Sequence, residues 1–136
     1  MSEQRHYERV SPGQKVKVTL SAVHAQARMG PCGVEFRHEE SGALGIIAEG
    51  ELTPTGRRFS HPSGVAWPVS EVKIEIEVPR MEPGIYKVAR IWAESFGGTP
   101  FQFEGEELYS AADIGFEVLA EPDTKPAMDV RVTRTS

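Results

Sequence analysis

Residues 71–93 (EVKIEIEVPRMEPGIYKVARIWA) constrain the fold more than any other part of the chain. Every second residue from Val72 to Val78 is apolar and β-branched, and the residues between them are Glu or Lys. This period of two is typical of a strand with one buried and one solvated face. Pro79 ends the pattern because proline has no N–H for a sheet ladder. A turn at 82–84 then leads into a second apolar run, so we predict two long strands around a corner.

Further strands follow from the same pattern. Residues 15–22 alternate clearly, and a Ser41-Gly42 turn joins the runs 34–39 and 43–49 as a hairpin. Weaker patterns suggest strands within 108–121 and 130–133, and residues 106–112 are the best place for a helical turn. Many short strands separated by turn residues predict an all-β fold, an antiparallel β-sandwich of about six to eight strands.

Three segments break the alternation and are predicted to be irregular connections. They are residues 24–33, 53–70 and 95–105. The second holds three prolines and two glycines, and we expect Phe59, Val65 or Trp67 within it to pack on the core. Residues 1–10 fit an N-terminal arm or edge strand, residues 11–121 the sandwich domain, and residues 122–136 a polar tail or short strand.

Composition limits the classes of function. The chain has 136 residues, which suits one domain, and a formal net charge of −5. An acidic balance disfavours nucleic acid and an anionic membrane surface as partners. No apolar run reaches the roughly 18 residues that a membrane span needs, and no signal peptide is evident. We expect a cytoplasmic protein, or a domain of a larger secreted one.

The corner carries a family resemblance. Glu82-Pro83-Gly84-Ile85-Tyr86-Lys87-Val88 resembles the P-G-x-Y-x-V step of immunoglobulin-like and fibronectin type III-like sandwiches. In that family the Tyr precedes the penultimate strand, and its hydroxyl bonds back to the backbone. The resemblance implies an immunoglobulin-like fold and no particular function. The chain departs from antibody domains because Cys32 is its only cysteine.

Metal ligation is one candidate chemistry. His24, Cys32 and His38 have donor atoms that suit zinc or copper, and sheet pairing could bring them together. Their spacing is not that of a zinc finger, and the alternative is two loop or strand-end histidines with a small buried thiol. Glu104, Glu106 and Glu107 similarly admit calcium binding or a solvated acidic loop.

Catalytic patterns are weak. A Cys32–His pair lacks any supporting feature, no G-x-S-x-G elbow occurs, and no phosphate-binding loop matches. We therefore predict a protein that is not an enzyme and has no cofactor.

The segment 95–109 gives the strongest functional signal because it is long and rich in aromatic residues. It carries Phe96, Phe101, Phe103 and Tyr109, and Trp67 lies in the other long connection. These rings either form a contact surface for a protein or sugar, or fold back to cap the core.

Two functions remain open at this point. The first is a non-catalytic binding or interaction module that contacts a protein partner, or forms a homo-oligomer, through these aromatic residues or exposed strand edges. The second is a small metal- or carbohydrate-binding sandwich, which could serve as an accessory domain of an enzyme.

Overall fold

The structure, a computed structural model, describes residues 7–24, 29–120 and 127–135. These residues form nine strands and one 3₁₀ helix. The elements in order are β1 (Glu8–Val10), β2 (Lys15–Val23), β3 (Met29–His38), β4 (Leu44–Glu51), β5 (Thr53–Ser60), β6 (Ala66–Glu77), β7 (Gly84–Ser95), β8 (Pro100–Glu104), η1 (Gly105–Asp113) and β9 (Gly115–Val118). The prediction of an all-β fold is confirmed.

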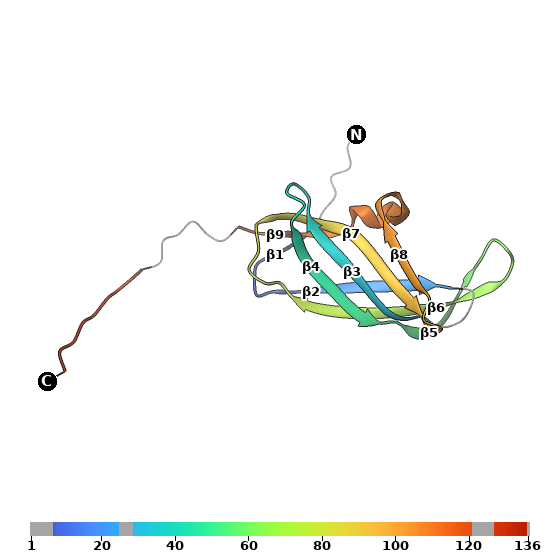
Figure 1. The fold of residues 1–136 in the computed structure, drawn as a ribbon, viewed down its shortest axis with the longest axis horizontal. Helices are drawn as coiled ribbons and strands as arrows, with labels where there is room; N and C mark the ends of the chain where they lie inside the picture. The colour runs from blue at the N-terminus through green and yellow to red at the C-terminus, as the bar shows by residue number, and fades with distance from the viewer. Residues whose placement is uncertain (1–6, 25–28, 121–126, 136) are drawn as a thin grey trace.

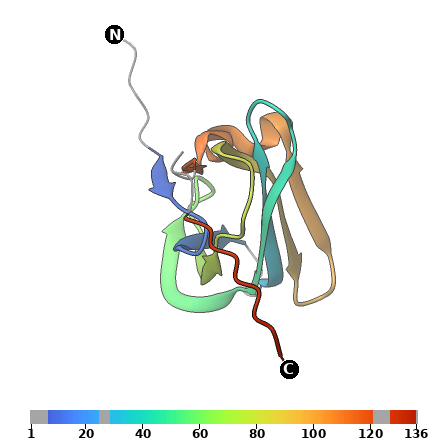
Figure 2. The same ribbon diagram turned by 90° about the vertical axis from the view of Figure 1, so that its left-hand side faces the viewer.

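The strands form two sheets that face each other as separate layers (Figures 1 and 2). The smaller sheet has the order β2-β6-β5, and the larger has the order β1-β9-β7-β3-β4. Strand β8 pairs with the second half of β7, on the edge whose first half pairs with β9. All pairs are antiparallel except β1 with β9, which are parallel.

The alternating runs behave as predicted. Strand β2 pairs along its whole length with β6, with Val16 opposite Ile76 and Leu20 opposite Val72. Exposure alternates along both strands, because the apolar face packs on the core while lysine and glutamate face water. The Ser41-Gly42 turn between β3 and β4 is also confirmed.

The core lies between the sheets. Its largest fully buried side chains are Tyr86, Val34, Val78 and Val118. Aromatic packing centres on Phe116, whose ring stacks on Tyr86 at 5.6 Å and meets Phe36 edge-on at 5.3 Å. A smaller cluster near the other end of the molecule contains Met29, Cys32, Leu52 and Ala93.

The corner between β6 and β7 is held by polar contacts to its backbone. The Tyr86 hydroxyl donates a 2.6 Å hydrogen bond to the carbonyl oxygen of Glu82. Nearby, Nε2 of the buried His38 lies 3.0 Å from the Pro83 carbonyl oxygen. Gly84 has a φ of 137°, and a Cβ there would lie 2.4 Å from the His38 ring. The corner therefore requires glycine at this position.

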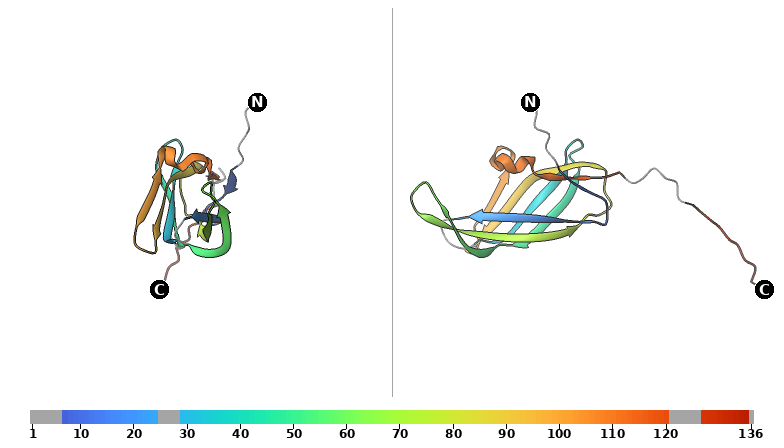
Figure 3. Two further views of the ribbon diagram at one scale, coloured as in Figure 1. Left: turned by 90° about the vertical axis from the view of Figure 1, so that its right-hand side faces the viewer. Right: turned by 180° about the vertical axis from the view of Figure 1, so that it is seen from behind.

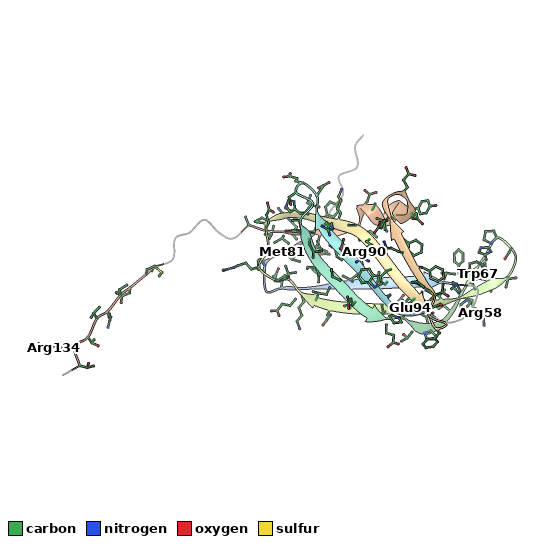
Figure 4. All side chains as sticks on the ribbon, in the orientation of Figure 1. Arg58, Trp67, Met81, Arg90, Glu94 and Arg134 are labelled. Atoms are coloured by element: carbon green, nitrogen blue, oxygen red, sulfur yellow. The ribbon has the colours of Figure 1, made fainter. Side chains whose placement is uncertain are left out.

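The outer face of the larger sheet carries a charged cluster over a tryptophan. Glu35 accepts hydrogen bonds from Arg37 (2.8 Å) and Arg90 (3.5 Å). The Arg90 guanidinium lies 4.3 Å from the centre of the Trp92 ring, and this ring packs directly on Gly33. Figure 4 shows Arg90 midway along β7. These contacts hold β3 and β7 together on the solvent side.

The three segments predicted to be irregular are largely strands. Residues 53–70 form most of a β5–β6 hairpin, and residues 100–104 pair with β7 as β8. Strand β3 begins at Met29 and runs through Gly30-Pro31-Cys32-Gly33, which close the first of these three segments. The prediction of an irregular connection was wrong for residues 29–33, because this segment pairs with β7 and the Trp92 ring, distant in sequence, packs on Gly33.

The segment after β8 combines a predicted and an unpredicted feature. The expected helical turn is present as η1, which buries Leu108. Strand β9 is shorter than the predicted 108–121 and starts at Gly115. Residues 127–135 form no strand and extend away from the sandwich (Figure 1). Within the described ranges, no helix has the length and apolar character needed to cross a bilayer.

Candidate functional site

Exposed apolar side chains gather at one end of the sandwich. At this end, the last residue of β2 lies opposite the first part of β6 (Val23 opposite Val69). The first residue of β3 lies there opposite the last residue of β7 (Met29 opposite Ser95). The tip of the β5–β6 hairpin protrudes at this end, opposite the end from which the C-terminal segment departs (Figures 1 and 3). We call the hairpin tip together with the β7–β8 turn the loop end; its apolar and aromatic members are Phe59, His61, Val65, Trp67 and Phe96.

Strand pairing and ring stacking fix the positions of the aromatic residues near the hairpin tip. Phe59 lies directly opposite Trp67, so their side chains share one face of the hairpin. The His61 ring stacks on Trp67 with a 3.8 Å separation of ring centres and an angle of 10°. Phe59 is 52% exposed and Val65 is 61% exposed, whereas Trp67 is half-buried. Figure 4 shows Trp67 and Arg58 on this hairpin.

Backbone hydrogen bonds close the hairpin. The His61 N–H donates to the Val65 carbonyl oxygen (3.2 Å), and the Gly64 N–H donates to the His61 carbonyl oxygen (2.9 Å). The Ser63 N–H also donates to Nδ1 of His61 at 3.1 Å. A tip bonded in this way loses little conformational freedom when a partner binds, which favours affinity.

The β7–β8 turn adds a second exposed ring. The Ser95 N–H donates to the Thr99 carbonyl oxygen at 2.9 Å, and the Thr99 N–H donates to the Ser95 hydroxyl at 3.1 Å. Phe96, inside this turn, is 60% exposed. Its side chain lies on the Gly30 side of the turn, where a Cβ on Gly30 would lie 3.7 Å from the ring.

The other aromatic residues of the segment 95–109 do not join the loop end. Phe101 is half-buried, packs on the smaller core cluster and contacts the His24 ring at 5.7 Å. Phe103 lies opposite Ile91 on β8 and is 39% exposed. Tyr109 belongs to η1, is 84% exposed and has a positive φ of 49°. The predicted contact set is therefore divided among three places, and only Phe96 and Trp67 lie at the loop end.

The three metal-ligand candidates do not converge. Cys32 and His38 lie six residues apart on β3, a separation of about 20 Å at the rise of a strand. Both nitrogens of the His38 ring are engaged, Nε2 with Pro83 and Nδ1 as acceptor from the N–H groups of Glu40 and Ser41. Within the described ranges, no group of three His, Cys, Asp or Glu side chains could hold a metal ion.

The Cys32 thiol is also a poor nucleophile. Its side chain is buried, and the Sγ–H donates to the Gly50 carbonyl oxygen at 3.5 Å. Burial raises the pKa of the Cys32 thiol, so the reactive thiolate is disfavoured at neutral pH.

Sequence reasoning missed the stacking of His61 on Trp67 and the exposure of Phe59 and Val65. A signal was present: Pro62-Ser63-Gly64 is a turn sequence between two short runs that contain β-formers. That pattern predicts a hairpin with a polar tip, which would have placed the flanking aromatic residues opposite each other.

Comparison of the chain with protein-family models, with curated proteins and with solved structures finds no match.

Proposed function

We propose that this chain is a non-catalytic binding module with an immunoglobulin-like sandwich, and that it contacts a protein partner through the loop end. The single observation that carries the proposal is the exposure of Phe59 and Val65 on a hydrogen-bonded hairpin that protrudes from the sandwich. Exposed apolar groups on a rigid, protruding element are typical of protein interaction sites.

Two features support the immunoglobulin-like assignment. The strand order β2-β6-β5 facing β9-β7-β3-β4 corresponds to the B-E-D and G-F-C-C′ order of that fold. The Tyr86–Glu82 hydrogen bond has the form of its tyrosine corner. In this correspondence the β2–β3 connection and the β7–β8 turn occupy the places of the B–C and F–G loops. Those loops form the binding end of antibody variable domains.

The composition of the loop end favours a protein over a sugar. Sugar binding by stacking needs an open aromatic face, and one face of Trp67 is covered by His61. Phe59, Val65 and Phe96 instead offer apolar side chains of the kind that fill pockets on a protein partner. Arg58 on the same hairpin, whose guanidinium donates to the Ala66 carbonyl oxygen at 3.4 Å, supplies a positive charge at the rim.

The test uses a photo-crosslinking amino acid at position 65, introduced into the full chain in the source cells. A matched variant carries the same group at Ile47, which is 42% exposed on β4 of the larger sheet. We expect position 65, and not position 47, to capture a discrete protein. That protein, purified, should bind the wild type and lose at least about tenfold affinity for a Phe59→Ala/Val65→Ala variant.

An equal pattern of crosslinks from both positions would overturn the proposal. So would a captured protein that binds the double variant as tightly as the wild type. Thermal unfolding of the double variant provides the control for folding, since both side chains are exposed and their loss should leave the midpoint unchanged.

A further inference from the structure

An apolar groove opens between the edges of the two sheets, away from the loop end. Its volume is about 380 Å³, and it lies between β2 on one side and β1 with β9 on the other. Its apolar lining consists of Val10, Val16, Val18, Phe36, Ile114 and Phe116. Because Phe36 and Phe116 are core residues, the groove leads directly into the main hydrophobic core.

Strand β2, which forms one wall of this groove, has one edge with no paired strand among the described residues. Strand β2 is the outermost strand of its sheet and pairs on one side only, with β6. Along nine residues, no strand of the described segments lies on its other side. A free strand edge beside an apolar groove can accept one more strand, whose backbone pairs with the edge while alternate side chains fill the groove.

Residues 127–135 of the same chain have the sequence of such a strand. Met128, Val130 and Val132 are 83%, 85% and 93% exposed, and they alternate with Asp129, Arg131 and Thr133. This period of two would place all three apolar side chains on one face of a strand. Figure 4 shows Arg134 of this segment far from the sandwich. In this position the side chains of Met128, Val130 and Val132 are exposed and do not pack on the apolar core of the described residues.

The segment can reach the edge of β2 in its own molecule. Val118, the last residue of β9, lies opposite Val10, and the Leu119 N–H donates to the Val10 carbonyl oxygen at 2.8 Å. From Val10, four residues suffice for the chain to reach the start of β2. The residues from 119 to 126 can span about 26 Å, more than that distance. A segment arriving from this end would run parallel to β2.

One parallel register of residues 127–135 on β2 gives the added strand favourable neighbours on both of its faces. With Val130 beside Val18, Met128 lies beside Val16 and faces the groove. On the outer face the same register sets Asp129 beside Lys17 and Arg131 beside Thr19. The antiparallel alternative with Val130 beside Val18 would set Arg131 beside Lys17, which is a repulsive pair.

We propose that residues 127–135 dock in the groove of their own molecule and add to β2 as a parallel strand that closes the sandwich. Tethering favours this occupant over the tail of a second copy, because an attached segment has a high effective concentration. The N-terminal sequence MSEQRH is a poor competitor, since it has no alternating apolar residues.

Disulfide trapping tests the register. In a Cys32→Ala background, Lys17→Cys with Asp129→Cys should form a disulfide within one chain under mild oxidation. The matched control is Lys17→Cys with Thr135→Cys, where the register separates the two positions by about 20 Å. We expect the first pair to close at least about ten times faster, measured by intact mass and non-reducing gels. Equal rates, or a disulfide between two chains, would overturn the proposal.

Hydrogen exchange gives a second measurement that needs no cysteine. The amides of β2 that do not bond to β6 should exchange at least about ten times faster in Val130→Asp than in the wild type. Thr133→Asp carries the same added charge on the outer face and should leave their exchange unchanged. If both variants exchange like the wild type, the segment does not dock on β2. A variant lacking residues 1–6 should also match the wild type; faster exchange there would assign the groove to the N-terminal segment.

Discussion

The hydroxyl of Tyr86 donates a 2.6 Å hydrogen bond to the carbonyl oxygen of Glu82, four residues earlier in the chain. The side chain of Tyr86 is almost completely buried, and its ring stacks on Phe116 in the core. One side chain therefore ties the corner between the two sheets to the centre of the molecule. Burial also raises the pKa of the Tyr86 hydroxyl, so it remains a hydrogen-bond donor across the neutral range.

Replacing Tyr86 by Phe should lower the free energy of unfolding by about 1–2 kcal/mol, because the Glu82 carbonyl loses its partner while the ring packing stays. Urea unfolding measures the effect. Tyr109→Phe is the matched control, since Tyr109 is 84% exposed, and it should change stability by less than about 0.5 kcal/mol. Equal stabilities of the two variants would mean that the corner hydrogen bond contributes nothing.

Gly33→Ala should destabilise the protein by about 1–3 kcal/mol because the added Cβ would lie 2.0 Å from the Trp92 ring. Gly97→Ala is the control: its Cβ would meet only the Ser95 hydroxyl, at 3.8 Å. The double variant Gly33→Ala/Trp92→Ala should lose less stability than the sum of the two single changes, because removing the indole removes the clash. Additive losses would contradict the packing of Trp92 on Gly33.

The segment 95–109 should respond differently at its two phenylalanines. Phe101→Ala should cost about 1–3 kcal/mol, because Phe101 packs on the smaller core cluster. Phe96→Ala should cost less than about 0.5 kcal/mol, because Phe96 is 60% exposed in its turn. Chemical denaturation measures the stability of both variants. It thereby distinguishes a ring that packs on the core, as expected for Phe101, from a ring that faces solvent, as expected for Phe96. A large loss at Phe96 would show that it too is structural.

Stability should fall in acid partly through Glu35. The hydrogen bond from Arg37, with the nearby charge of Arg90, lowers the pKa of the Glu35 carboxyl in the folded state. Its stabilising contribution is therefore complete above the unfolded pKa, about 4.3, and is lost as pH falls through the lower folded value. Glu35→Gln should flatten the decline of unfolding free energy below about pH 4.5.

The control for this pH dependence is Glu51→Gln, at an exposed position on β4. It should retain the acid decline of the wild type. Should Glu35→Gln retain that decline as well, the interaction of Glu35 with the two arginines would not be what makes folding sensitive to acid.

The part of the fold that the sequence predicts is the part whose burial alternates. Strands β2 and β6 each have one face on the core, so Val16–Leu20 and Val72–Ile76 carry a visible period of two. The hairpin turn at Ser41-Gly42 and the corner tyrosine were equally readable, because turn chemistry and the tyrosine motif are local in sequence.

Strand β5, which the sequence did not predict, is held by contacts that leave no such pattern. Strand β5 is exposed along nearly its whole length, and it is retained by pairing with β6 and by contacts such as the Thr55 hydroxyl to the Val69 carbonyl oxygen (2.9 Å). Strand β8 did carry a signal, since Phe101 and Phe103 alternate with Gln102 and Glu104. The candidate site depended on the β5–β6 hairpin, so missing the hairpin meant missing the exposure of Phe59.

The parallel pairing of β1 with β9 has a consequence for biosynthesis. Glu8 and Phe116 are partners although more than a hundred residues separate them. A ribosome adding roughly 5–20 residues per second would need about 5–20 s between making the first strand and making its partner. During that interval β1 lacks the strand with which it pairs, and the larger sheet cannot be completed before β9 has emerged. Long-range pairing of this kind slows folding, so the pairing of β1 with β9 should be among the last steps in the assembly of the larger sheet.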